Sequence, residues 1–221
     1  QDAVNKSRGK DVKNSVVSSD DFGEIDALKF SAAMRIFAEW RIVRHVPVGY
    51  KGYAVGMSLG HKDVVQNLAK IEQSVHSWLD HQREETSRQE QSEDEGEIVC
   101  PVPSPQSELR SPTLRELLQH ELETEVHPTL PLLKDKTAAM GLLWVYRQFH
   151  YQTALFVNVL NVPKRFPSTK DAVSTAYKEV YDRYNGWAVQ KIFSYSFQAA
   201  PDASEIYKFM NPHRMEEVLK D

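Results

Sequence analysis

Three polar side chains share one face of a predicted helix. Asp63, Asn67 and Lys70 are separated by four and three residues, so a helix places an acceptor, an amide and a cation along one stripe. Such a stripe can bind the hydroxyl groups of a ligand, because the carboxylate accepts hydrogen bonds, the ammonium donates them and the amide can do either. The pattern alone favours a simpler alternative, a solvated helix face.

Two tryptophans stand in distinctive contexts. Trp144 lies in an otherwise mostly apolar helix, where burial in the core is the ordinary role of this residue. Trp187 follows Gly186 at a predicted helix start, and Lys191 comes four residues later. An aromatic ring with a nearby ammonium is typical of an anchor at a membrane surface.

Other groups that carry chemistry miss the spacing they need. His120 has no second histidine four residues later, and His76 and His81 are five residues apart, so the helical zinc pattern is not met. The single cysteine, Cys100, lies in an acidic segment that disfavours a thiolate. The sequence has no glycine-rich phosphate loop and no Gly-x-Ser-x-Gly turn. We therefore expect no metal, no cofactor and no enzymatic activity.

Length and composition describe a folded domain. The chain has 221 residues, 41% of them hydrophobic and 26% charged, which is enough for a core. A net charge of −4 argues against a nucleic-acid partner. No apolar stretch is long enough to span a bilayer, and the amino end has no signal-peptide block. We expect a cytoplasmic monomer with a flexible segment at 1–23 and one domain at 24–221.

An acidic segment interrupts this domain. Residues 83–111 contain eight acidic and three basic residues, which gives a formal charge of −5, and prolines at 101, 103 and 105. The segment has few branched apolar residues, so it buries too little apolar surface to offset the entropy cost of ordering. The composition predicts a disordered insertion.

The rest of the chain is patterned as helices. A first apolar stripe consists of Ile25, Leu28, Ala32, Ile36 and Trp40, and either Asp20 or Asp21 is a suitable cap. A second helix is predicted at about 59–80, with an apolar stripe of Val64, Leu68, Ile71, Val75 and Trp78, and a third after a cap at Thr113 or Ser111. Further helices are predicted at about 134–160, from a cap at Ser168 to about 184, and at about 187–199 and 204–210. Glycines at 52, 56 and 60 are expected to break the chain before the second helix. The helix at 134–160 is apolar nearly all round, which predicts a buried central element. The fold class is all-α.

Three motifs together resemble the glycolipid transfer protein family. The first is Asp63, Asn67 and Lys70; the second is LLWVYR at 142–147, and the third is NGWAVQKIF at 185–193. They occur in the family's order with compatible helix spacing. The resemblance covers about 25–82 and 112–210. It implies a two-layer all-α sandwich that encloses a pocket for lipid chains.

The resemblance also implies a function and a set of site residues. It implies a protein that binds a sphingolipid and transfers it between membranes. The implied headgroup and amide site is Asp63, Asn67, Lys70, Trp144 and Asn185. The implied chain pocket includes Phe37, Leu143 and Phe193, and the implied membrane contacts are Trp187 and Lys191.

The headgroup class follows from two of these positions. Members that carry ceramide-1-phosphate have an arginine at the position of Trp144 and a cation at the position of Asn67, because phosphate favours cations. The sequence therefore resembles the glycolipid branch and predicts a glycosylceramide ligand. One departure is Asn185, which stands where the family has histidine. The alternatives are a ceramide-1-phosphate carrier, a lipid sensor that acts through a partner, and a helical scaffold with a weakened pocket.

Overall fold

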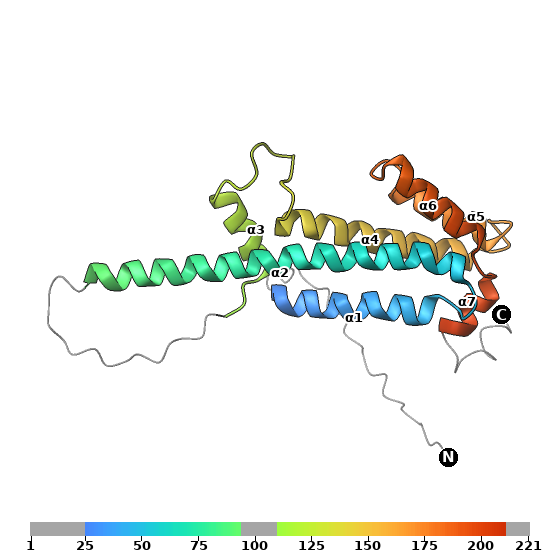
Figure 1. The fold of residues 1–221 in the computed structure, drawn as a ribbon, viewed down its shortest axis with the longest axis horizontal. Coiled ribbons are helices and arrows are strands. Elements are labelled where there is room, and N and C mark those ends of the chain that lie inside the picture. Colours follow the sequence, from blue (N-terminus) through green and yellow to red (C-terminus); the bar gives the residue numbers. More distant parts are fainter. Residues whose placement is uncertain (1–24, 94–109, 211–221) are drawn as a thin grey trace, which may run out of the picture.

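The computed structural model describes residues 25–93 and 110–210, and within these ranges the chain is helical apart from loops and two isolated bridges (Figure 1). The helices are α1 (Ala27–His45), α2 (Lys51–Glu93), α3 (Leu114–Glu123), α4 (Ala138–Leu160), α5 (Thr169–Val180), α6 (Trp187–Gln198) and α7 (Ala203–Met210). The all-α prediction is confirmed. The flexible segment predicted at 1–23 lies outside the described residues.

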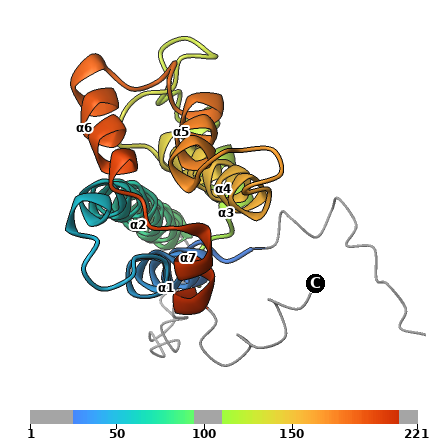
Figure 2. The same ribbon diagram turned by 90° about the vertical axis from the view of Figure 1, so that its right-hand side faces the viewer.

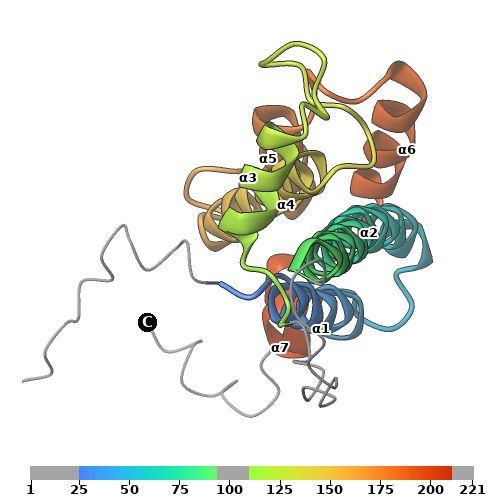
Figure 3. The same ribbon diagram turned by 90° about the vertical axis from the view of Figure 1, so that its left-hand side faces the viewer.

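The long helix α2 organises the molecule. Helices α1 and α2 lie side by side, α4 packs along α2 from the other side, and α5 packs on α4 (Figure 2). Helix α6 lies over the first turns of α2 and also contacts α5, whereas α3 contacts the middle of α2 and the start of α4 (Figure 3). The result is a layer of α1, α2 and α6 against a layer of α4 and α5.

The buried face of α1 differs from the predicted stripe. The helix begins at Ala27, and the Asp26 carboxylate caps it by accepting from the Lys29 backbone N–H at 2.9 Å. The predicted stripe is exposed, with Ile36 at 73%. The buried face is instead Ala27, Ser31, Met34, Ala38, Arg41 and His45. Small residues let α1 approach α2 closely, and its buried end is polar.

Helix α2 is longer at both ends than predicted. Its apolar stripe is confirmed, because Val64, Leu68, Ile71 and Val75 are all buried. The three glycines expected to break the chain lie inside the helix, and two of them, Gly52 and Gly56, make room for α6. A Cβ at Gly52 would lie 2.7 Å from the Ala199 Cβ, and one at Gly56 would lie 2.5 Å from the Ser196 hydroxyl.

The start of the acidic segment also differs from the prediction. Residues 83–93, expected as part of a disordered insertion, continue α2 as a helix. Their helix-forming composition, with side-chain pairs such as Arg83 with Asp80 at 2.8 Å and Arg88 with Glu84 at 3.6 Å, suits this state. The remainder of the predicted insertion, 94–109, lies outside the described residues.

Helix α4 has two sides rather than one apolar surface. The helix is central and mostly buried, as predicted, but it also has an exposed side, where Tyr146 is 65% and Leu160 66% exposed. Its buried face joins apolar residues to three amides, Gln148, Gln152 and Asn158. A central helix therefore carries polar groups into the interior between the layers.

Candidate functional site

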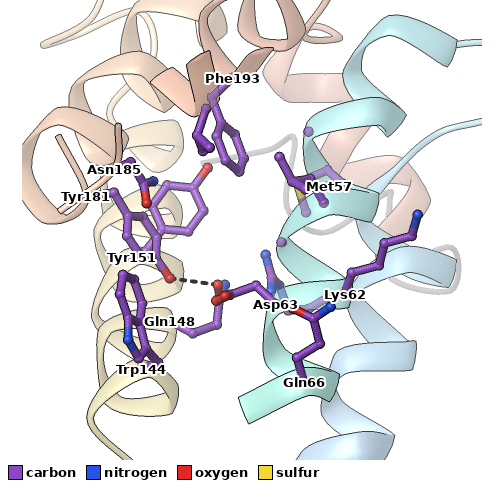
Figure 4. Close-up of a pocket in the computed structure, with 15 residues that line it drawn as sticks. Met57, Lys62, Asp63, Gln66, Trp144, Gln148, Tyr151, Tyr181, Asn185 and Phe193 are labelled. Atoms are coloured by element: carbon purple, nitrogen blue, oxygen red, sulfur yellow. Dashed lines mark hydrogen bonds between the residues drawn. The ribbon is translucent and has the colours of Figure 1, made fainter. Parts of the chain in front are cut away.

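A cavity of about 250 Å³ lies where α2, α4 and α6 meet (Figure 4). Side chains from α2 form one wall, those from α4 and from the turn after α5 form the facing wall, and Phe193 of α6 lies across the end. The lining residues are Arg41, Gly56, Met57, Leu59, Gly60, Lys62, Asp63, Gln66, Trp144, Gln148, Tyr151, Tyr181, Asn185, Val189 and Phe193. Three of the five predicted headgroup residues are in this set: Asp63, Trp144 and Asn185.

The polar stripe of α2 is only partly directed into the cavity. Asp63 lines it, and burial raises the pKa of its carboxyl, opposed by the Asn67 amide and by Lys70. Asn67 is 3% exposed and donates to Asp63 Oδ1 at 3.2 Å and to the Asp63 carbonyl at 2.8 Å. Lys70 does not line the cavity; its ammonium lies 2.6 Å from Asp135. Asn67 therefore orients Asp63, whereas Lys70 lies outside the lining of the cavity.

Close packing fixes α4 against this stripe. Gly141 passes so near α2 that a Cβ there would lie 2.6 Å from the Asn67 carbonyl oxygen. The first turn of α4 is held by the buried Glu121 carboxylate, which accepts from the backbone N–H groups of Ala138 at 2.5 Å and Ala139 at 3.1 Å. These two contacts set the position of α4 along α2, and so the level at which Trp144 lies opposite Asp63.

Trp144 is half-buried among aromatic and cationic groups. Its ring is nearly parallel to that of Tyr181, with centroids 6.4 Å apart, and the Tyr184 ring meets it edge-on. The Arg147 guanidinium lies 4.6 Å from the Trp144 ring centroid and 3.6 Å from that of Tyr184. The indole is thus held in place at the cavity wall rather than packed in the core.

Asn185 is positioned by the turn before α6. Its backbone carbonyl accepts from the Gln190 side chain at 2.8 Å, and its own amide donates to the Tyr177 hydroxyl at 2.7 Å. Burial raises the pKa of Tyr177, so this hydroxyl stays protonated near neutrality. One N–H and the oxygen of the Asn185 amide remain for a ligand.

The predicted chain-pocket residues do not lie together. Phe193 lines the cavity, but Leu143 and Phe37 do not. Leu143 is half-buried. Phe37 belongs to a separate cluster between α1 and α4, where its ring stacks on Phe149 with centroids 5.3 Å apart.

The predicted membrane contacts lie on the outer side of α6. Trp187 is 73% exposed and Lys191 is exposed; both line a shallow hollow beside Asp182 and Lys178. Tyr195, two turns after Trp187, is 75% exposed. The structure therefore leaves an aromatic ring, a cation and a second aromatic ring accessible on one helix.

The sequence interpretation missed a buried polar network behind the headgroup residues. Arg41 is 2% exposed and lines the cavity, and burial lowers its pKa. The Gln148 amide lies 2.8 Å from the Tyr181 hydroxyl, a hydrogen bond drawn in Figure 4. When the amide oxygen faces Arg41 it accepts from Nη1 at 2.5 Å and Nη2 at 3.0 Å, and its nitrogen donates to Tyr181. The signal was the helical spacing of Arg41 and His45 with Met34 and Ala38, opposite the apolar stripe.

Two other classes of site were sought in the described ranges, 25–93 and 110–210. No group of three or more His, Cys, Asp or Glu side chains gathers there in a way that could hold a metal ion. No helix in these ranges is both long enough and apolar enough to cross a membrane. Asp63 is the one carboxylate among the described residues that line the cavity, whereas glycoside hydrolysis ordinarily needs a facing pair.

Comparison with known proteins agrees with the three motifs. Searches of curated proteins and of solved structures found no match to this chain. The family model for glycolipid transfer protein matches residues 54–212, which is well over half of the chain and contains the cavity-lining parts of α2, α4 and α6. On this match, the chain belongs to the glycolipid transfer protein family.

Proposed function

We propose that this protein binds a glycosylceramide in the cavity between α2, α4 and α6 and carries it between membranes. Family membership supports the coarser statement, glycolipid binding and transfer. The observation that carries the finer one is the placement of Trp144 opposite Asp63 across a single cavity. An indole face suits the apolar side of a hexose, and a carboxylate suits its hydroxyl groups or an amide N–H.

The ceramide amide has suitable partners in this arrangement. Its N–H donates to the Asp63 carboxylate, and its carbonyl accepts from the remaining N–H of Asn185. Both residues line the cavity from opposite sides. Asn67 supports the first contact, because its amide already donates to Asp63 at 3.2 Å.

The lipid chains enter toward α6 in this proposal. The lining there is apolar, with Met57, Val189 and Phe193, and it continues into the larger core cluster of the protein. A cavity of about 250 Å³ is smaller than the roughly 300–1,000 Å³ of ordinary ligand sites. Binding therefore requires α6 to move away from α2. At Gly52 and Gly56 the contact surface of α2 has no side chains.

Contact with the membrane is assigned to the outer face of α6. Trp187 and Lys191 are exposed on the helix that covers the cavity, so insertion of the ring beside anionic headgroups would act on the same helix that must move. We propose that the protein acts as a monomer that touches the membrane only transiently.

The test is transfer of labelled lipid between vesicles. Galactosylceramide and lactosylceramide are compared with ceramide-1-phosphate at equal concentrations. We expect both glycolipids to transfer faster, and Trp144→Ala to abolish their transfer while circular dichroism remains helical. Leu118→Ala, a change on the outside of α3, serves as the control. Faster transfer of ceramide-1-phosphate would refute the glycolipid assignment.

The second candidate is a sensor that retains its lipid. The observation that favours it is the close packing of α6 on α2, where the Gly56 N–H donates to the Ser196 hydroxyl at 3.1 Å, because this contact would slow the release of an enclosed lipid. A sensor would co-purify with lipid in native mass spectrometry and yet show no transfer between vesicles. A scaffold with a weakened pocket would show neither.

A further inference from the structure

The inner wall of the cavity is more polar than hydrocarbon chains require. Arg41 and Gln148 are each 2% exposed, and both line the cavity with Tyr151 and Tyr181. One turn further along α4, Gln152 is 3% exposed and neither its oxygen nor its nitrogen has a partner in the structure. Buried polar groups are normally paired. Gln152 and the Nε of Arg41 lack a partner among the described residues, and unpaired groups of this kind beside a cavity point to a ligand that supplies the missing partners.

The charge of Arg41 is the most demanding of these groups. No ion pair joins it to a carboxylate within 25–93 and 110–210, and its Nε has no hydrogen-bond partner there. The polar groups around the Arg41 guanidinium are all uncharged: the Gln148 oxygen, tyrosine hydroxyls and His45. Burial and the nearby Arg41 charge lower the pKa of His45 to about 3, so it is uncharged at neutral pH. Arg41 is thus a buried cation that still needs an acceptor.

The same cavity also presents an acceptor. Asp63 lines it, and the charges of both Asp63 and Arg41 act on the Tyr181 hydroxyl, whose pKa is raised chiefly by burial. With Gln148 donating to it, this hydroxyl keeps its own proton free to donate. A phosphate or sulfate would only accept, and it would share the cavity with the Asp63 carboxylate. A hydroxyl both accepts and donates and carries no charge, so it fits the whole set.

We infer that this wall binds a hydroxyl group of the ceramide next to its amide, so that the protein selects hydroxylated ceramides. The inference rests on the proposed function. With the amide held by Asp63 and Asn185, the first carbons of each chain pass Arg41, Gln148 and Tyr181. The hydroxyl at sphingoid C3 is common to ceramides, so the positions that vary are acyl C2 and sphingoid C4. Arg41 is then a specificity-determining residue that donates to this oxygen.

The experiment compares glucosylceramides of equal chain length. One has no extra hydroxyl, one has a 2-hydroxyacyl chain, and one has a 4-hydroxysphingoid base. We expect one of the hydroxylated lipids to bind and transfer better by about tenfold or more, since a hydrogen bond to a charged group is of that size. Arg41→Met should remove the preference, so that the ratio of hydroxylated to plain lipid transferred falls to about one, whatever the total rate of transfer. Arg44→Met, on the exposed side of the same helix, is the matched control.

The outcomes separate the inference from the proposed function. Equal transfer of all three lipids by the natural protein overturns the inference and leaves glycolipid transfer in place, whereas transfer of none contradicts the proposed function itself. Preference for ceramide-1-phosphate that Arg41→Met abolishes would assign the wall to an anion and also overturn the inference. Thermal unfolding reports whether Arg41→Met folds. If it does not, Gln148→Leu takes its place in the comparison, and an unchanged preference in that variant overturns the inference.

Discussion

Replacing the cavity carboxylate Asp63 by asparagine should separate binding from stability. The amide keeps the shape of the side chain and an oxygen that accepts from Asn67, whose nitrogen lies 3.2 Å away in the natural protein. The substitution removes the negative charge of the carboxylate that would accept a hydrogen bond from the ceramide N–H. Asp63→Asn therefore changes one property at the point where Asp63 faces Trp144.

The size of the effect on binding follows from the kind of hydrogen bond. A bond to a charged group contributes roughly 1.5–3 kcal/mol and a neutral one roughly 0.5–1.5 kcal/mol, so the difference is about 1–1.5 kcal/mol. This corresponds to a loss of affinity of roughly five- to tenfold. Asp63→Val, which removes the acceptor altogether, should lose more and abolish transfer.

The effect on stability should have the opposite sign. Burial raises the pKa of Asp63, so the folded state takes up its proton at a higher pH than the unfolded state does. Such a group costs stability while it is ionised, and the cost is relieved as pH falls through the raised pKa. Asp63→Asn removes the charge and should leave the melting temperature at pH 7 unchanged or higher.

The assay pairs vesicle transfer with thermal unfolding across pH. Glycolipid binding by the natural protein should weaken as acid protonates Asp63, starting above the ordinary carboxyl range, and Asp63→Asn should be flat over the same interval. Asp80→Asn, an exposed carboxylate of α2 paired with Arg83 at 2.8 Å, is the control. A lower melting temperature together with unchanged transfer in Asp63→Asn would refute the reasoning and make the carboxylate structural.

Three further predictions concern packing, the amide site and the acidic segment. Gly141→Ala should destabilise the protein by about 1–3 kcal/mol because its methyl group would press on α2, whereas Gly60→Ala, with open space around it, should gain about 0.4–1 kcal/mol; equal melting temperatures would contradict this. Asn185→His should raise glycolipid transfer because the imidazole is longer than the amide, and Asn185→Ala should cost little because it loses one neutral hydrogen bond of about 0.5–1.5 kcal/mol; a strong loss in the alanine variant would show that the asparagine is fully engaged. Replacing 83–109 by a short Gly/Ser linker should leave the melting temperature and transfer nearly unchanged, and a large loss of either would show that this segment supports the fold.

The sequence by itself determined the elements and the family. The apolar repeat at Val64, Leu68, Ile71 and Val75 predicted the buried face of α2 because the period of a helix is fixed by its backbone geometry. The caps Thr113 and Ser168 were local signals of the same kind, and both side chains accept from a backbone N–H three residues later. The motifs predicted the family because they record residue types in order, which needs no coordinates.

Only the tertiary structure decided which faces meet. The stripe of α1 with the larger apolar residues is exposed, and the face with Ala27, Ser31 and Ala38 is buried, because small side chains at these positions allow α1 to approach α2 closely. In the sequence the glycines at 52 and 56 indicated a turn, whereas in the folded structure they lie inside α2 and contact α6. Lys70 has the spacing of Asp63 and Asn67, but an ion pair with Asp135 holds it away from the cavity wall. A cavity is formed by residues distant in sequence, so Arg41 and Gln148 became visible as one wall only when α1 and α4 were packed together.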